Sequence, residues 1–459
     1  MRTLGMTHST CPECRKLVPA KIQSEDNAVY FLKFCSEHGE SRALVRTNLD
    51  DYIKTLRYVK PAWTPMEFSG DSSLSCPEGC GFCSRHEQHL CMPIVEITSR
   101  CDLECPICIV SAGRNWDMQL DEFKTILSKL VKSELQIDVL NISGGEPLLH
   151  PQILDFIDNA LSHPEIIRVS ISTNGLPLLE NEHLLSELLK RNVVISLQFD
   201  GFDDDAYEIL RGRHLLKEKL SIMDMLERSG ISTSLTMTVA KGVNDKQLRP
   251  VLDRLFSTGN FISLMLQPIA FAGRAANLRE LERLTIPELT CLLGKSGHPA
   301  VSEKDFFPLP CSHPLCFSLS FYLMLEDSSA VSVGQLVDAN TLLDSLANRV
   351  IFGLDRSEHE KIKDLIYDLW SGPSGTAPDS QKVLKTLKGI LKEMSSCSFD
   401  PKKAFEQAER RIKSIFIHAF QDADTFDLSR VRRCCQGYPQ ADGKLIPACV
   451  NNVFRRSRK

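Results

Sequence analysis

The chain has 459 residues, a net charge of −5 and 42% hydrophobic residues. This length suits roughly two to four domains with a large core, and the mild negative charge argues against bulk binding of nucleic acid. No apolar run reaches the roughly eighteen residues of a membrane span, and the first residues lack a signal-peptide core. We therefore expect a cytoplasmic protein without a transmembrane segment. The basic stretch 454–459 is either solvated or allows peripheral contact with anionic lipid head groups.

The 17 cysteines lie in tight groups. Because the cytosol keeps thiols reduced, such groups indicate metal sites and not disulfides. We expect four regions. They are a metal-knuckle region over 1–60, an iron–sulfur cluster segment over 61–92, an α/β core over 93–285 and a C-terminal, mainly helical region with a further cluster over 286–459.

The first cysteine group flanks a predicted strand at 28–34. Cys11 and Cys14 form a CxxC pair before it. Cys35 and His38 follow it in a CxxH pair. Three thiols and one imidazole suit one tetrahedral zinc or rubredoxin-like iron, and the sequence does not separate the two metals. The pattern predicts a mononuclear site with a structural or electron-transfer role.

A second group lies in a segment with loop character. Its candidate ligands are Cys76, Cys80, Cys83 and Cys91. Four cysteines are the usual ligand set of a closed 4Fe–4S cluster, so we predict an auxiliary cluster here. His86 or His89 is an alternative to Cys91 as the fourth ligand.

The spacing CxxxCxxC occurs again directly after a predicted strand, 93–98, with Cys101, Cys105 and Cys108. Three thiolates on one tight loop can hold three irons of a 4Fe–4S cube, which leaves the fourth iron open to a small molecule. The alternatives are a structural zinc or a closed cluster, but zinc knuckles rarely use three cysteines at this spacing.

Apolar, β-rich runs alternate with amphipathic stretches from 91 to about 270. The predicted strands are 93–98, 136–143, 166–173, 193–200, 232–239 and 261–268. The predicted helices are 118–133, 151–163, 180–191, 214–229 and 244–257. Six such β/α steps predict a parallel sheet covered by helices, with its chemistry at the carboxyl ends of the strands.

Polar residues and glycines follow these strand ends. The candidates for cofactor binding are Gly144, Gly145, Glu146, Ser172, Asn174, Gln198 and Asp200. Two adjacent glycines let the backbone approach a ligand closely. Loop capping is the alternative role for Ser172, Asn174 and Asp200. Arg274, after the last strand, either meets a phosphate or carboxylate of the substrate or faces solvent.

The last cysteines form a third candidate group beyond the core. They are Cys311, Cys316, Cys434, Cys435 and Cys449, and either Cys434 or Cys435 could be the ligand. The Asp442-Gly443 pair predicts a hairpin that brings its flanking cysteines together, so we expect a second auxiliary 4Fe–4S cluster. The segment 327–420 favours helices, with a loop at 371–378 and no chemical signature.

The Cys101 motif, followed by Gly-Gly-Glu-Pro at 144–147, resembles the radical S-adenosylmethionine (SAM) superfamily. The resemblance implies a partial (β/α)6 TIM barrel of the radical SAM type, with SAM chelating the open iron and Gly-Gly-Glu-Pro contacting its amino group. It implies further SAM contacts from Ser172 and Asn174, and a reductant such as flavodoxin or ferredoxin. The 5′-deoxyadenosyl radical formed there would abstract hydrogen from unactivated carbon.

The cysteine layout at both ends and in the core also resembles archaeal tetraether lipid synthase and its bacterial membrane-spanning-lipid relatives. That resemblance implies a lipid substrate, with two chains joined by a C–C bond. Related proteins are described as pterin methyltransferases, so a methyltransferase acting on a pterin or other small molecule is the alternative. The lipid function predicts an apolar tunnel, with candidate lining residues Leu264, Leu266, Phe271, Leu319, Phe321 and Leu323; core packing is the alternative role for each of them and the favoured one.

Overall fold

The computed structural model describes residues 1–68, 70, 73, 75–77, 79–110, 116–337, 342–344, 346, 380–395 and 409–456. Structural statements below concern these residues. The predicted loop at 371–378 and the last three residues of the basic tail lie outside them. Among the helices so described, none combines the length and hydropathy needed to cross a membrane.

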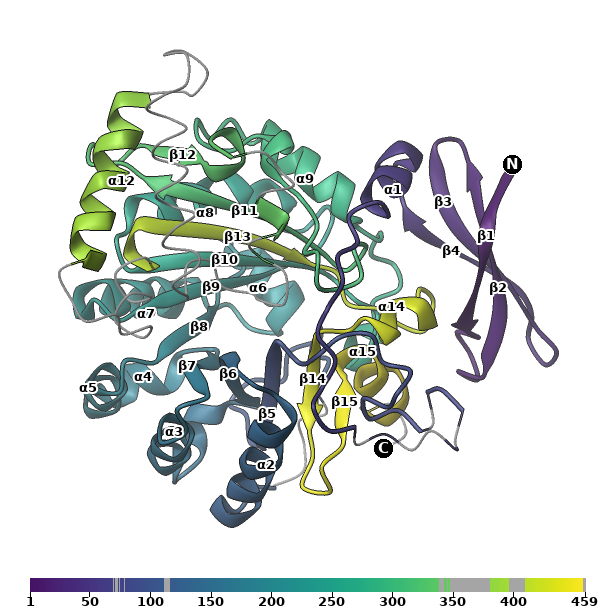
Figure 1. Ribbon diagram of the computed structural model, residues 1–459, viewed down its shortest axis with the longest axis horizontal. Helices are drawn as coiled ribbons and strands as arrows, with labels where there is room; N and C mark the ends of the chain where they lie inside the picture. The colour runs from purple at the N-terminus through teal and green to yellow at the C-terminus, as the bar shows by residue number, and fades with distance from the viewer. Residues whose placement is uncertain are drawn as a thin grey trace.

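Six parallel strands in chain order form the centre of the molecule (Figure 1). They are β5 (Met92–Thr98), β6 (Ile137–Gly144), β7 (Ile166–Thr173), β8 (Val194–Gln198), β9 (Thr233–Val239) and β10 (Phe261–Pro268). All six coincide with predicted strands. Parallel neighbours in chain order are what successive right-handed β/α units produce, so the predicted (β/α)6 core is confirmed.

Helices cover the outer face of this sheet. The predicted ones are α2 (Leu120–Ser133), α3 (Ile153–Leu161), α5 (Glu182–Lys190), α7 (Leu216–Ser229) and α8 (Leu248–Ser257). Three more were not predicted: α4 (Leu176–Glu180), α6 (Asp204–Arg211) and α9 (Ile286–Lys295). Helix α9 carries a capping box between Thr285 and Glu288, so the β/α alternation continues past the predicted end at 285.

The C-terminal region extends the central sheet at both edges. Strand β13 (Ile412–His418) pairs in parallel with β10, and β11 (Phe317–Met324) and β12 (Ala330–Ser332) continue that edge antiparallel. At the other edge β14 (Gln436–Pro439) pairs in parallel with β5 and forms the predicted hairpin with β15 (Leu445–Pro447). The described part of this region is therefore rich in strands, where helices had been predicted.

The remaining helices of this region are short or peripheral. They are α12 (Ser380–Ser395), α14 (Leu428–Arg432) and α15 (Ala448–Val450). Short 3-10 turns span Pro147–Leu149, Asp245–Gln247, Gly273–Asn277, Glu303–Asp305 and Val333–Gln335, and a π-helical turn spans Asn451–Arg455. The end of the described chain packs inward, because Arg456 is buried and pairs with Glu96.

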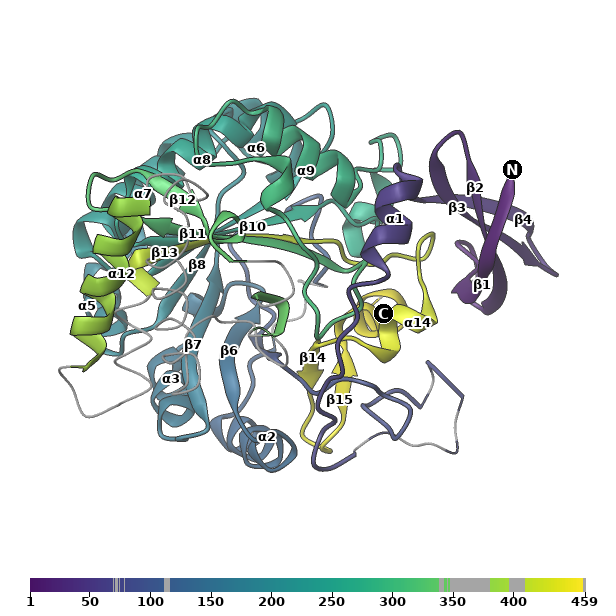
Figure 2. The same ribbon diagram turned by 45° about the horizontal axis from the view of Figure 1, so that its top comes forward.

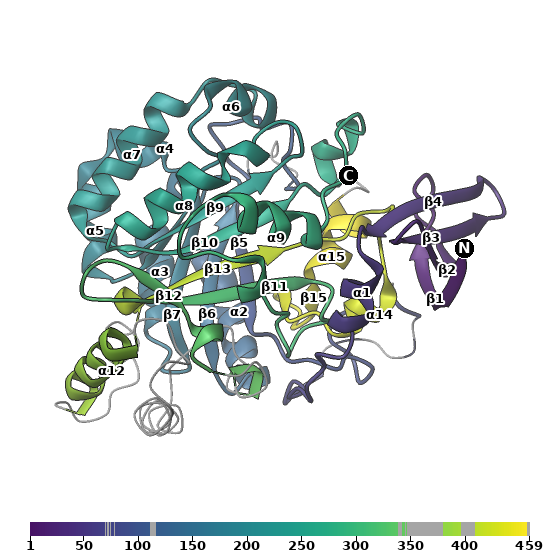
Figure 3. The ribbon, with the colours of Figure 1, turned by 90° about the horizontal axis from the view of Figure 1, so that it is seen from above.

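The N-terminal region is a four-stranded antiparallel sheet followed by α1 (Leu49–Thr55). Its strands are β1 (Arg2–Thr10), β2 (Leu17–Glu25), β3 (Ala28–Cys35) and β4 (Gly39–Arg46). Figures 2 and 3 show this sheet at the end of the molecule opposite α12. It is attached to the loop before α14: Thr7 Oγ1 donates to Asp427 Oδ1 at 2.6 Å and Lys33 Nζ to the Asp424 carbonyl at 2.6 Å.

Candidate active site

The loop that follows β5 brings Cys101, Cys105 and Cys108 into one packed cluster with apolar neighbours. Burial raises the pKa of Cys101 to about 12 and also raises that of Cys105. A thiol buried in this way ionises only when a positive charge lies beside it, and a bound metal provides that charge. The donor set therefore fits a metal cluster.

Two parts of the core hold this loop in place. The amide of Ile107 donates to the Leu210 carbonyl at the end of α6, at 3.5 Å. On the other side the amide of Arg274 donates to the Cys108 carbonyl at 3.0 Å. The buried Nε and Nη2 of Arg274 have no hydrogen-bond partner in the described part of the chain. Unsatisfied donors beside the cysteine loop suit an anionic group, so Arg274 does not simply face solvent.

The Gly-Gly-Glu motif packs directly on the start of the same loop. A Cβ on Gly145 would lie 2.2 Å from the Arg100 carbonyl oxygen, and one on Gly144 2.3 Å from that of Thr98. The Gly145 amide donates to the Thr98 carbonyl at 2.8 Å, and the Glu146 amide donates to the Arg100 carbonyl at 2.6 Å. Only glycine allows this approach, so the motif fixes where the cysteine loop begins.

The carboxylate of Glu146 is hydrogen-bonded to other parts of the fold. It is fully buried and accepts hydrogen bonds from Thr173 Oγ1 at 2.7 Å, from the Asn174 amide at 2.7 Å and from the Leu148 amide at 3.1 Å. Burial nevertheless raises its pKa to about 7. Glu146 thus ties the glycine motif to the end of β7.

The side chains of Asn174 and Ser172, at the end of β7, have different surroundings. Asn174 Nδ2 donates to Asp102 Oδ1 at 2.5 Å, and its Oδ1 accepts from the Leu176 amide at 2.8 Å. It therefore joins the cysteine loop to the start of α4. Ser172 points into a cavity inside the sheet and donates to Asn141 Oδ1 at 3.1 Å.

Gln198 and Asp200 lie at the end of β8, each with a partner that the sequence analysis missed. Lys219 is buried in α7 and donates to Gln198 Oε1 at 2.7 Å and to the Asn174 carbonyl at 2.5 Å. Arg211 pairs with Asp200 and also contacts the Cys105 thiol. A lysine on the apolar face of a predicted helix was a usable signal for Lys219, whereas nothing in the sequence marks Arg211.

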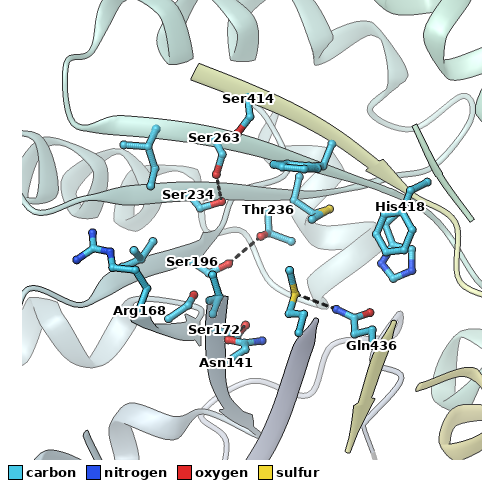
Figure 4. Close-up of a pocket in the computed structure, with 18 of the residues that line it drawn as sticks. Asn141, Arg168, Ser172, Ser196, Ser234, Thr236, Ser263, Ser414, His418 and Gln436 are labelled. Carbon is cyan, nitrogen blue, oxygen red and sulfur yellow. Dashed lines mark hydrogen bonds between the residues drawn. The ribbon is translucent and has the colours of Figure 1, made fainter. Parts of the chain in front are cut away.

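A cavity of about 240 Å³ lies inside the curved sheet (Figure 4). Hydroxyl and amide side chains line its strand side: Asn141, Ser170, Ser172, Ser196, Ser234, Thr236, Ser263, Gln267 and Ser414. Several of them bond to one another, with Ser196 to Thr236 at 3.0 Å and Ser234 to Ser263 at 2.6 Å. Arg168 and Glu409 form a buried ion pair at one end, at 2.8 Å.

The wall formed by β5, β11, β13 and the loop before β11 is more apolar. It includes Met92, Leu309, Phe317, Phe321 and Phe416. Of the six residues predicted to line a lipid tunnel, only Phe321 lines this cavity. Leu264 and Leu266 pack in the main core, because their side chains point to the other face of β10. Leu319 and Leu323 are buried in smaller clusters, and Phe271 lies under the Arg283 guanidinium. These five residues do not line the cavity, and the four leucines have the core-packing role that was the favoured alternative for them.

The N-terminal candidates converge as predicted. The ligand atoms of Cys11, Cys14, Cys35 and His38 all lie within 4.8 Å of one another. Cys35 Sγ lies 3.6 Å from His38 Nδ1, and this hydrogen bond is the main reason why the pKa of Cys35 falls to about 6. The arrangement fits one tetrahedral metal.

The second group keeps only three of its four predicted members. Cys76 and Cys80 pack in one cluster, and burial with the neighbouring Cys76 and Cys83 thiols raises the pKa of Cys80 to about 12. His86 stacks on Phe82, and its Nε2 lies 2.9 Å from the Cys434 carbonyl. That nitrogen therefore faces a backbone oxygen and not the thiols.

Cys91 lies with the C-terminal group, which differs from its predicted place beside Cys76. Hydrogen bonds with the Cys311 and Cys435 thiols, together with burial, raise its pKa well above the usual value. The backbone explains the placement, because the Cys91 amide donates to the Cys435 carbonyl at 2.9 Å where β14 meets β5. His89 Nε2 lies 3.4 Å from the Cys91 thiol.

The other C-terminal cysteines lie close to this set. Cys316 belongs to the same packed cluster as Cys91, Cys311 and Cys435, and it accepts a hydrogen bond from Arg430 Nε at 3.3 Å. Burial and the neighbouring Cys449 thiol raise the pKa of Cys434. The β14–β15 hairpin therefore gathers these thiols as predicted.

Comparison with known sequences identifies two segments. Residues 95–255 match the sequence model of the radical SAM superfamily, and residues 3–47 match that of the HMPTM N-terminal zinc ribbon domain. The 7,8-dihydro-6-hydroxymethylpterin dimethyltransferase of Methanocaldococcus jannaschii is 27% identical over 98% of this chain and 94% of its own length. A GTP 3′,8-cyclase of Listeria monocytogenes is 30% identical over 47% of this chain and 65% of its own.

Among solved structures, Streptococcus suis SuiB bound to S-adenosylmethionine matches 44% of this chain and 46% of its own, at 15% identity and a TM-score of 0.38. An anSMEcpe structure with bound AdoMet matches 45% of this chain and 58% of its own, at 15% identity and a TM-score of 0.34.

Proposed function

We propose, from the premise that residues 95–255 form a radical SAM superfamily domain, that this chain transfers methyl groups to a pterin or a closely similar small molecule. The observation that carries the proposal is the likeness to a pterin dimethyltransferase over nearly the whole of both chains, N-terminal ribbon included. The lipid-synthase resemblance has no such counterpart among these relatives.

The site supports this chemistry with residues of its own. Cys101, Cys105 and Cys108 would hold a 4Fe–4S cluster, and the backbone amide of Arg274 bonds to the last of these cysteines. When bound, that cluster and SAM supply a 5′-deoxyadenosyl radical that removes hydrogen from unactivated carbon. The Glu146 carboxylate and the amides of Gly145 and Glu146 are already bonded within the fold, so this motif would contact the SAM amino group through the backbone carbonyls of Gly144 and Gly145.

The cavity supports a compact, polar substrate. Its volume of about 240 Å³ is below the range of roughly 300–1,000 Å³ for drug-sized ligands, so a small fused ring suits it better than two lipid chains. The hydroxyl and amide side chains along the strands offer hydrogen bonds that a lipid chain could not use.

The remaining thiols would hold metals of their own. We propose one mononuclear metal in the N-terminal ribbon and auxiliary 4Fe–4S clusters at the two other cysteine groups, supplied with electrons by flavodoxin or ferredoxin. Here the Cys91 thiol serves the group of Cys311, Cys316 and Cys435.

One observation supports the joining of lipid chains as a second candidate function. The apolar wall of the cavity, with Phe317 and Phe321, packs against the Cys91, Cys311 and Cys435 thiols. An alkyl chain on that wall would lie near an auxiliary cluster.

One experiment separates the two candidates. Reconstituted protein is incubated without oxygen with a reductant, SAM and either a reduced 6-hydroxymethylpterin or a lipid extract, and the products are analysed by mass spectrometry. We expect 5′-deoxyadenosine and a pterin that carries additional methyl groups. Joined lipid chains with an unmodified pterin would instead establish the second candidate.

A further inference from the structure

Two buried side chains at the β13–β14 end of the cavity have unused hydrogen-bonding atoms. His418 ends β13 and Gln436 begins β14; they are 5% and 7% exposed. His418 Nδ1 and Gln436 Oε1 have no hydrogen-bond partner in the described part of the chain, and Gln436 Nε2 reaches only the Met92 sulfur at 3.2 Å. Figure 4 shows both side chains on the same side of the cavity, away from Arg168.

Several polar groups elsewhere in the cavity already have partners within the protein. The hydroxyls on β8, β9 and β10 pair with one another, and Glu409 neutralises Arg168. Buried polar atoms without partners are rare in folded proteins, because they lose their bonds to water and gain nothing in return. Apart from Arg168, which is paired with Glu409, the described cavity residues that keep a buried side-chain atom without a partner are His418 and Gln436.

Packing fixes the direction of His418. Its ring stacks on Phe317 with centroids 3.9 Å apart and planes 14° apart, and Phe420 covers it at 4.0 Å. Burial and the nearby Arg430 lower the pKa of His418 to about 3, so the ring is neutral and offers one donor and one acceptor. The fixed imidazole of His418 and the amide of Gln436 suit a ligand edge on which hydrogen-bond donors and acceptors alternate.

We propose that Gln436 and His418 together bind the hydrogen-bonding edge of a planar heterocycle, the edge on which a ring N–H and a carbonyl or amino group are adjacent. Gln436 matches such an edge with its own adjacent acceptor and donor, as glutamine does on adenine. The inference rests on the proposed function and deepens it, because a reduced pterin has such an edge.

The test measures binding to the metal-loaded protein by anaerobic equilibrium dialysis. The probes are reduced 6-hydroxymethylpterin and quinoxaline, a fused ring of similar size without the amide edge. Gln436→Leu and His418→Phe remove the polar atoms and keep much of the volume; Gln436→Glu keeps the acceptor and removes the donor. Exposed residues of the same types give the controls, Gln440→Leu and His183→Phe.

We expect each cavity variant to bind the pterin at least about tenfold more weakly, with quinoxaline binding unaltered and both controls like the wild type. Iron content and unfolding curves identify any variant that fails to fold, and Gln436→Glu is then decisive. Full pterin affinity in folded Gln436 and His418 variants would overturn the inference and leave the proposed function standing. Absence of pterin binding to the wild type would overturn both.

Discussion

The guanidinium of Arg211 makes two hydrogen bonds with the fully buried carboxylate of Asp200, Nε to Oδ2 at 2.6 Å and Nη2 to Oδ1 at 3.0 Å. The same arginine contacts the Cys105 thiol. It therefore joins the end of β8 to the cysteine loop, which lies far upstream in the sequence.

Replacing Arg211 by Met should cost stability and cluster retention together. The substitution leaves the Asp200 charge buried without its partner, which typically costs about 3–5 kcal/mol. Denaturant unfolding and iron content measure the two effects. The matched control is Arg213→Met, because Arg213 is a neighbouring arginine whose side chain is half exposed. This variant should change neither the stability nor the iron content by much. Unchanged stability of Arg211→Met would contradict the role assigned to this pair.

Gly145→Ala should disturb the cysteine loop through steric contact alone. The new Cβ would lie 2.2 Å from the Arg100 carbonyl oxygen, so one of the two backbone segments must move. Misplacement by about 1 Å near a reacting centre can cost roughly 100-fold in rate. We expect deoxyadenosine release to fall by at least about tenfold. Gly259→Ala, where a Cβ meets nothing within 4 Å, should leave release unaltered.

The ion pair at one end of the cavity should be essential to the fold. Arg168 donates to both oxygens of Glu409 at 2.9 and 2.8 Å, and both side chains are at least nine-tenths buried. Arg168→Met leaves Glu409 unpaired and should destabilise the protein by about 3–5 kcal/mol. The more exposed pair of Arg191 and Asp158 provides the comparison, and Arg191→Met should cost about 1 kcal/mol or less. Equal losses in the two variants would refute this assignment.

Retention of metal by the N-terminal ribbon should depend on pH through Cys35. His38 holds the pKa of this thiol near 6, below its usual value, so the thiolate persists down to about that pH. Protons compete with the metal for this thiolate, hence the affinity of the site for its metal should weaken further as the pH falls below about 6. His38→Ala removes one ligand and lets the Cys35 pKa rise, so release should occur at higher pH. His8→Ala, on exposed β1, is the control. A dye that reports free zinc follows the release.

The sequence predicted the β/α core well because its strands are continuous apolar runs and its helices are amphipathic. The four ribbon candidates also lie together, since Cys11 and Cys14 are in the turn between β1 and β2 and Cys35 and His38 are where β3 turns into β4. Cys91 was assigned to the wrong neighbours for a physical reason. Its place depends on the pairing of β14 with β5, which joins residues far apart in the chain and leaves no local signal.

Strands β12 and β13 of the C-terminal region were missed for a related reason. Strand β13 is a short alternating run that follows a long segment with helical character, and its partner β10 lies far upstream. The same pairing brings His418 to the cavity. Lys219 was the one overlooked residue with a readable signal, a cation within the buried face of α7.

The most direct measurement of the central claim is SAM cleavage by the reduced protein with and without the cysteine loop. Wild type, incubated anaerobically with SAM and dithionite, should release 5′-deoxyadenosine and methionine in equal amounts. The triple variant Cys101→Ala, Cys105→Ala, Cys108→Ala should release neither, while the ribbon keeps its metal. Continued deoxyadenosine release by that variant would contradict the assignment of this loop as the SAM-cleaving centre.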